Sequence, residues 1–178
     1  MDIETYDPKL FAVGIATLHR MRVGVLARGE VEQVEWAWRL GFRSMQWMRF
    51  EQCAAGPGHR EWRAHAEAVA NAARERDVRI SAIGAYYRNP MDPRQTERAR
   101  ATWQQAIEVA AHIGVRTVSG FVGGVITTEM NERGGNPVYQ PLELHLPEML
   151  VFWEPLARFA ADKGVRLAFE NCDMGGTW

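Results

Sequence analysis

One short pattern recurs four times along this chain and limits what it can fold into. Each copy has a residue suited to a left-handed backbone, then a hydrophobic residue, then an arginine. The copies are Gly41-Phe42-Arg43, Asp77-Val78-Arg79, Gly114-Val115-Arg116 and Gly164-Val165-Arg166, with hydrophobic positions 36, 37 and 50 residues apart. A helix that ends at a glycine and leads into an apolar strand fits this pattern. The period predicts one helix-and-strand unit that is used repeatedly.

Apolar residues at helical spacing fill the segments between the copies. Spacings of i, i+4, i+7 and i+11 run from Trp62 to Ala73, from Ala99 to Ala110 and from Met149 to Ala160. A shorter version spans Val31 to Trp38. These spacings predict four amphipathic helices. Pro155 lies inside the last of them, so we expect it either to kink that helix or to mark its true start.

Short apolar runs alternate with these helices, as in a parallel sheet that helices cover. The expected strands are Val23 to Ala27, Ser44 to Met48, Ile80 to Ala85, Thr117 to Val122 and Arg166 to Glu170. Five strands and four helices also suit a flavodoxin-like open sheet, but such a sheet usually closes with a fifth helix. Nothing helical follows Glu170, so the α/β plan is expected to be unfinished.

Composition limits the class of protein. A chain of 178 residues with 47% hydrophobic residues is long enough for one domain with a core. A net charge of −1, with acids and bases mixed, gives no reason to expect nucleic acid or an anionic membrane as a partner. The two cysteines fit no metal or disulfide spacing, and the early apolar run from Leu10 to Leu18 is too short to span a bilayer. We therefore expect a cytoplasmic protein.

Residues 1–20 precede the first clear strand and are interpreted as an N-terminal extension, with one domain over residues 21–178. The segment from Gly123 to Leu146 interrupts the period and is rich in Gly, Asn and Pro. A long connection that follows a strand is either an active-site lid or a plain surface insertion. The sequence leaves both interpretations open.

Glu170 is the strongest candidate for a functional residue. It stands at the end of the last expected strand, and the C-terminal ends of parallel strands form the functional edge of such sheets. Alternation puts Ala168 and Glu170 on one side and the bulky Leu167 and Phe169 on the other, where helices would cover them. A lone carboxylate facing inward needs a partner. That partner is either a metal ion or an arginine of a neighbouring strand.

Several short segments of the sequence resemble segments of the xylose isomerase-like TIM barrels, the sugar phosphate isomerase/epimerase superfamily. Their order and spacing along the chain are also similar. Gly164 to Cys172 (GVRLAFENC) is similar to the fifth strand of that family and Gly41-Phe42 to the approach to its second. Residues Ile80 to Tyr86 (ISAIGAY) resemble the third strand, and Ile113-Gly114-Val115 precedes the fourth. The resemblance covers nearly everything from Met21 onward. It implies a (β/α)₈ barrel, present here as an incomplete portion with about five strands.

The resemblance also implies a cofactor and a substrate class. The family holds a divalent metal, which would be Mn²⁺, Mg²⁺, Co²⁺ or Zn²⁺, with a Glu after strand five, an Asp after strand six, a His after strand seven and a Glu after strand eight. Only the first has a counterpart here, Glu170, which would be both metal ligand and catalytic acid or base. The partner would be a small sugar or sugar phosphate. With three ligands missing, we expect the chain alone to bind metal weakly and to be inactive.

Weaker candidates for substrate binding surround this position. They are Gln46, Arg49, Phe121, His145 and Asn171. Each also has an ordinary structural explanation, such as a satisfied polar strand residue for Gln46 or turn geometry for the segment around Phe121.

The implied reaction is isomerisation or epimerisation by proton transfer next to a carbonyl, or by a hydride shift. A sugar or inosose dehydratase of the same fold is an alternative. Another is a non-catalytic half-barrel that associates, as a homo-oligomer or with a second chain, through its open strand edges. Two branches of the family fit poorly. Gly176 stands where the ketose 3-epimerases have a second Glu, and the ends of strands two and three lack the histidines of endonuclease-IV-type relatives.

Overall fold

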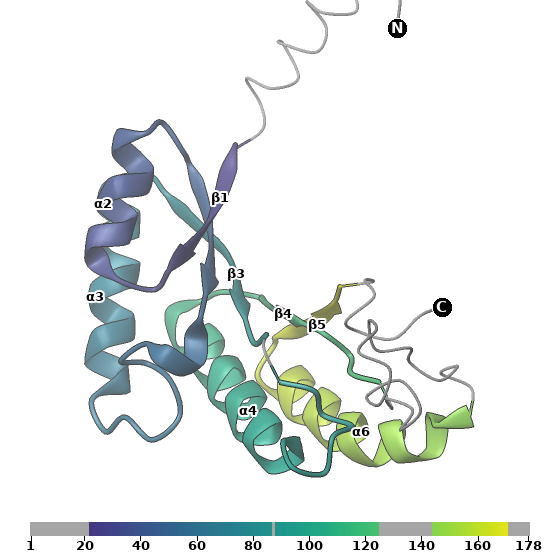
Figure 1. The fold of residues 1–178 in the computed structure, drawn as a ribbon. Coiled ribbons are helices and arrows are strands. Elements are labelled where there is room, and N and C mark those ends of the chain that lie inside the picture. Colours follow the sequence, from purple (N-terminus) through teal and green to yellow (C-terminus); the bar gives the residue numbers. More distant parts are fainter. Residues whose placement is uncertain (1–21, 87, 125–143, 171–178) are drawn as a thin grey trace, which may run out of the picture.

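The computed structural model describes residues 22–86, 88–124 and 144–170. In these segments five parallel strands form one sheet in chain order, and helices alternate with them (Figure 1). The strands are β1 (Gly24–Arg28), β2 (Ser44–Met48), β3 (Arg79–Gly84), β4 (Thr117–Gly120) and β5 (Arg166–Phe169). The helices are α2 (Val31–Arg39), α3 (Trp62–Glu75), α4 (Thr96–Ile113) and α6 (Leu146–Asp162), with a short 3₁₀ helix, η2 (Phe50–Gln52), after β2. The predicted fold class is confirmed. Both ends of β2 agree with the prediction, and no predicted strand end differs from the observed one by more than two residues.

The repeated sequence pattern is a helix terminator. Gly41, Asp77, Gly114 and Gly164 all have positive φ, from 51° at Asp77 to 88° at Gly41. The N–H of the next residue then donates to the carbonyl five residues back, as from Val115 to Ala110 at 2.8 Å. This is the bond of a Schellman motif, which satisfies a helix carbonyl and turns the chain out of the helix. Because the same turn ends all four helices, each strand starts from the same geometry.

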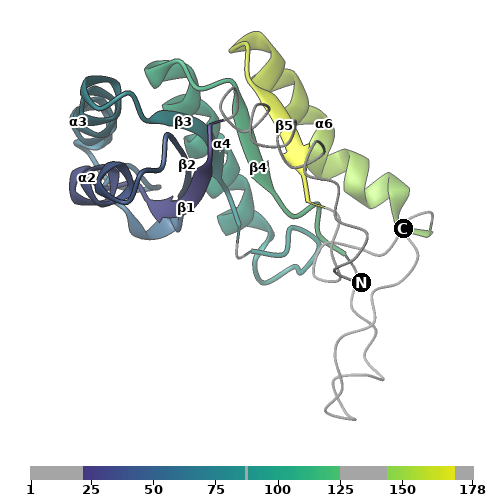
Figure 2. The same ribbon diagram turned by 90° about the horizontal axis from the view of Figure 1, so that it is seen from above.

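All four helices pack on one face of the sheet, and each contacts the next one along the chain (Figure 2). The side chains that strands send to this face are fully buried, as at Met45, Trp47, Ile83 and Val118. They belong to one continuous core with the inner faces of the helices. Alternation then directs the intervening strand residues to the other face, which no helix of the described residues covers.

Pro155 does not mark the start of the last helix. The helix α6 begins at Leu146, with Pro147 in its first turn, and continues through Pro155 to Asp162. Without an N–H, Pro155 leaves the carbonyl of Val151 without its usual helix partner. Val151 is 73% exposed, so water can satisfy that carbonyl. The second of the two expectations for Pro155 was therefore wrong.

Two expectations concern segments outside this description. The proposed N-terminal extension covers residues 1–20, and most of the long connection lies within residues 125–143. In the described part of the chain, no helix combines the length and hydropathy that crossing a membrane requires.

Candidate functional site

Glu170 follows β5 at the C-terminal edge of the sheet. Its N–H donates to the carbonyl of Gly120 at 3.0 Å, which continues the ladder between β4 and β5. The preceding Phe169 lies on the helix side, with its ring 4.6 Å from that of Trp153 and 6.0 Å from that of Trp103. Because side chains alternate along a strand, Glu170 belongs to the uncovered face. The predicted alternation of β5 is confirmed.

A hydrogen-bonded network on the uncovered face joins four neighbouring strands. The Gln46 amide of β2 donates to the Ser119 hydroxyl of β4 at 2.7 Å and lies 3.4 Å from the Tyr86 oxygen. Tyr86, just past β3, also interacts with Ser119 and with the Glu170 carboxylate. We refer to Gln46, Tyr86, Ser119 and Glu170 as the inner polar cluster. It brings together two residues predicted from the sequence and two that were missed.

Burial raises the pKa of the Tyr86 hydroxyl above its ordinary value. Hydrogen bonds from Ser119 and Gln46 act in the opposite direction, because they stabilise the phenolate. The Glu170 carboxylate raises the pKa of Tyr86 further, because it accepts a hydrogen bond from the neutral phenol and repels the negative charge of the phenolate. The outcome keeps Tyr86 protonated at neutral pH, so it can donate a hydrogen bond to Glu170.

Strand register explains why these side chains meet. Leu26 pairs with Gln46, Gln46 with Ala82, and Gly84 with Ser119, which places these positions on the same face of the sheet. A register shift between β2 and β3 at Met45/Gln46 determines which β3 residues share a face with Gln46. A side chain at Gly84 would come within 2.9 Å of the Tyr86 ring. Gly84 therefore leaves the space that the ring occupies.

The other predicted site residues lie at different distances along the same edge. Phe121, just after β4, packs edge-on against Tyr86 with ring centroids 4.9 Å apart, so it adjoins the inner polar cluster. Arg49 directly follows β2, is exposed, and has a left-handed backbone with φ of 54°. His145 immediately precedes α6. Asn171 lies outside the described residues.

A second carboxylate near this edge has a structural role. Glu51, in η2, has a side chain only 11% exposed, and Arg88 binds both of its oxygens at 2.9 and 3.1 Å. Thr102 of α4 donates to it at 2.7 Å, and Arg98 lies 3.4 Å away. These contacts tie η2 to α4.

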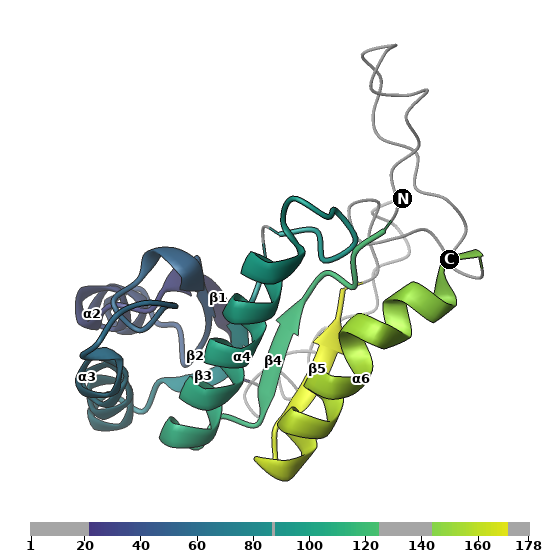
Figure 3. The same cartoon turned by 90° about the horizontal axis from the view of Figure 1, so that it is seen from below.

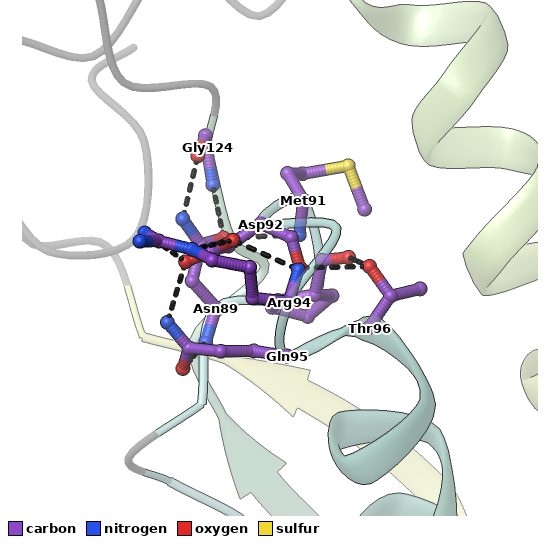
Figure 4. Close-up of polar contacts among 8 residues, drawn as sticks. Asn89, Met91, Asp92, Arg94, Gln95, Thr96 and Gly124 are labelled. Atoms are coloured by element: carbon purple, nitrogen blue, oxygen red, sulfur yellow. Dashed lines mark hydrogen bonds and ion pairs between the residues drawn. The ribbon is translucent and has the colours of Figure 1, made fainter.

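The connection from β3 to α4 is fastened to the segment that follows β4 (Figure 4). The side chain of Asn89 donates to the carbonyl of Gly124 at 2.8 Å and accepts from the N–H of Gly124 at 3.1 Å. Gly123 has φ of 87°, and a side chain there would come within 2.6 Å of Pro90. The two glycines thus serve turn geometry and close packing. Together these contacts fix the two segments that follow Tyr86 and Phe121 in the chain.

Three residues at this edge were missed in the sequence. Tyr86 and Ser119 belong to the inner polar cluster, and the exposed Arg28 ends β1 on the same face, next to Met48 in register. A signal for Ser119 and Arg28 was present, because each alternates with a buried residue, Val118 or Ala27. For Tyr86 there was none, since its partners are 33 or more residues away in the sequence.

Glu170 could serve as one ligand of a metal ion, but one ligand does not make a complete metal site. A carboxylate is the donor that hard divalent cations prefer, and such ions need about six ligands. In the described residues, no three His, Cys, Asp or Glu side chains lie close enough to hold an ion together. The described residues therefore supply one strong ligand and neutral polar groups beside it.

The sequence matches the family of xylose isomerase-like TIM barrels over residues 34–178. The chain belongs to this family. Among curated proteins, no sequence is significantly similar to it. The family membership agrees with the strand order and with the helices on one face of the sheet.

Solved structures show the same fold at low sequence identity. The 3-keto-D-glucoside 4-epimerase of E. coli superposes with a TM-score of 0.62 at 13% identity over 85% of this chain and 56% of its own length. D-Psicose 3-epimerase of Clostridium cellulolyticum, solved with D-tagatose, superposes with a TM-score of 0.56 at 13% identity, over 85% of this chain and 52% of its own length. A xylose isomerase-like TIM barrel protein of Mycobacterium smegmatis, solved with magnesium, superposes with a TM-score of 0.55 at 16% identity, over 80% of this chain and 47% of its own length. This chain spans about half the length of these relatives.

Proposed function

We propose that this chain supplies the fifth-strand glutamate and part of the substrate wall of a divalent-metal-dependent sugar isomerase or epimerase. The observation that carries the proposal is the position of Glu170: it ends β5 on the uncovered face, held by Tyr86 in a network that crosses four strands. Glu170 is exposed there, so a substrate or a metal ion can reach its carboxylate. Membership in the family supports the same conclusion.

Each group of the inner polar cluster has a task in such a reaction. Glu170 takes a proton from, or returns it to, the carbon next to the substrate carbonyl, a role that suits a carboxylate at a strand end. Tyr86 orients Glu170 through its hydrogen bond. The amide of Gln46 and the hydroxyl of Ser119 offer donors and acceptors to sugar hydroxyls. The ring of Phe121 provides an apolar surface beside them.

The proposal extends to the cofactor and the substrate. A bound divalent metal would polarise the oxygens of the substrate, with Glu170 as one ligand. The substrate class is a small sugar or sugar phosphate, in line with solved relatives that contain D-tagatose or D-allulose. Ligands besides Glu170 would come from residues outside those described.

Manganese binding tests the role of Glu170. We expect the chain to bind Mn²⁺ with a dissociation constant on the order of a millimolar, because one carboxylate gives few ligands. Glu170→Gln removes the negative charge but keeps the shape, so it should abolish this binding. Electron paramagnetic resonance of free Mn²⁺ measures it directly.

Glu148→Gln is the matched control, because Glu148 is an exposed carboxylate in the first turn of α6. It should bind Mn²⁺ like the unmodified chain. Equal binding by both variants would refute the metal role of Glu170. A tight site that survives in Glu170→Gln would show that other ligands hold the metal.

A further inference from the structure

Positive charge collects at the opposite end of the sheet from Glu170. Two adjoining cavities of about 440 and 700 Å³ lie where the strands begin, between the ends of α3, α4 and α6. Arg116 and Arg166 line both of them. Arg74 and Arg79 complete the basic lining of the first cavity, and Lys163 that of the second. No acidic side chain of the described residues lines either cavity. We call these five residues and the space between them the basal cleft.

Within the segments that the structure describes, the basic groups of the basal cleft form no ion pairs with acids. Among the described residues, the ion pairs involve none of Arg74, Arg79, Arg116, Lys163 and Arg166. The neighbouring Asp77 is bound by Arg22 at 2.8 Å. Arg74 donates to the Asn71 amide, and the Lys163 ammonium lies 4.8 Å from the Phe159 ring.

The fold brings these charges together through its backbone. The N–H of Arg166, the first residue of β5, donates to the carbonyl of Arg116 at 2.9 Å, and Arg116 directly precedes β4. The same step of the ladder joins Arg79 to Arg43 at 3.0 Å. Figure 3 shows the starts of β4 and β5 together with the last turns of α4 and α6. The repeated pattern that ends each helix therefore also places an arginine at each of these positions.

Helix dipoles explain only part of this charge. The ends of α3, α4 and α6 each carry about half a negative charge, which cations nearby stabilise. Five full positive charges exceed that sum several-fold. All five are exposed, so solvent screens part of their mutual repulsion, and a bound anion would offset the rest. The forked guanidinium of arginine matches the paired oxygens of a phosphate group.

We propose that the basal cleft is a binding site for a small free anion of the phosphate class, separate from the inner polar cluster. The cleft is recessed between helix ends, which suits a small ligand rather than a headgroup in a bilayer. The proposal does not depend on Glu170 or on a metal. It gives this chain a second ligand site at the end of the sheet remote from the proposed chemistry.

Titration of the full chain with inorganic pyrophosphate at low ionic strength tests the proposal. We expect saturable binding of one pyrophosphate per chain by calorimetry. Arg116→Gln combined with Arg166→Gln should weaken it at least about tenfold, because each arginine contributes a charge-assisted hydrogen bond. Arg116→Lys combined with Arg166→Lys keeps the charge and should fold. Its affinity for pyrophosphate should lie between those of the unmodified chain and the double glutamine variant.

Arg60→Gln combined with Arg63→Gln is the matched control, since both arginines are exposed and lie at the start of α3. This variant loses the same charge and should bind pyrophosphate within about twofold of the unmodified chain. Absence of saturable binding, or equal weakening in both glutamine variants, would overturn the proposal. Cosedimentation with phosphatidic acid vesicles that equals the affinity for pyrophosphate would overturn the assignment to a free ligand.

Discussion

At the scale of single residues, the turn after β1 depends on a contact that allows no side chain. A Cβ at Gly29 would come within 1.5 Å of the Trp47 ring, which is fully buried. The carbonyl of Gly29 also accepts a hydrogen bond from the His65 ring at 2.6 Å. The ring of His65 in turn packs edge-on against Trp47, with centroids 6.1 Å apart. Three residues from β2, α3 and the first turn thus fix how β1 leaves the sheet.

We predict that Gly29→Ala lowers the free energy of unfolding by about 3 kcal/mol, because Trp47 must move within a packed core. Gly24→Ala is the control: its Cβ would lie 3.2 Å from the Ser44 Cβ, a tight contact that a small shift relieves, unlike the overlap at Gly29. It should change stability by less than about 1 kcal/mol. Urea unfolding followed by tryptophan fluorescence measures both. Equal effects of the two substitutions would contradict the role given to the Gly29–Trp47 contact.

At the scale of elements, the start of α4 is organised by Asp92. Its carboxylate accepts from the backbone N–H of Arg94 at 3.0 Å and from the Gln95 amide at 2.8 Å, and its carbonyl accepts from Thr96 at 3.0 Å (Figure 4). Hydrogen bonds from Arg94 are the main cause that holds the pKa of Asp92 far below its usual range, with Gln95 second. The side chain is 10% exposed, although the guanidinium of Arg94 is largely in solvent.

We predict that Asp92→Asn costs about 1 kcal/mol of stability at neutral pH. An unfolded Asp has a pKa near about 3.9, and the folded value is lower, so the folded chain binds fewer protons between the two. The stabilisation is therefore complete above about pH 4 to 5 and is lost as the pH falls toward the folded pKa. Urea unfolding at neutral pH and near pH 3 should show the difference between the two chains shrinking with acid.

Asp162→Asn serves as the control for this helix-end effect. Asp162 is an exposed acid at the end of α6, where a negative charge opposes the helix dipole. Its replacement should leave stability unchanged or slightly higher at neutral pH. A difference between Asp92→Asn and the unmodified chain that stays constant down to pH 3 would contradict the assignment.

At the scale of the whole molecule, apolar side chains are exposed along both lateral edges of the sheet, at β1 and beside β5. On β1, Leu26 is 62% exposed, and Val23, which directly precedes the strand, is 53% exposed. On α6, Val151 is 73% and Leu150 is 51% exposed, and Leu150 lines a groove with Leu167 and Phe169 of β5. Within the described residues, β1 and β5 are edge strands. Open edges and apolar patches favour association.

We predict that this chain self-associates as its concentration rises, which sedimentation velocity would detect. Leu150→Lys combined with Val151→Lys adds charge to the exposed face of α6 and should shift the chain toward monomer. The control, Ala101→Lys combined with Gln104→Lys, adds the same charge to the outer face of the central helix α4 and should leave association unchanged. A chain that stays monomeric at every concentration, or equal responses of the two variants, would count against association through this end.

The sequence by itself determined the features that depend on neighbouring residues. Gly114-Val115 predicts a helix end and a strand start because a positive φ and the 2.8 Å bond from Val115 to Ala110 involve one turn of chain. The alternation of Phe169 and Glu170 is equally local. Five strands, four helices and the position of Glu170 were therefore predictable.

Only the tertiary structure decided which side chains meet. The donor of Ser119 is 73 residues away at Gln46, and their contact depends on a register irregularity between β2 and β3 that no local pattern encodes. The same holds for Glu51, whose arginine partners come from later in the chain. Likewise, Arg116 and Arg166 become neighbours only when β4 pairs with β5. Local backbone preferences specify the elements, whereas strand pairing specifies the sites, because a hydrogen bond between strands depends on register and not on distance along the chain.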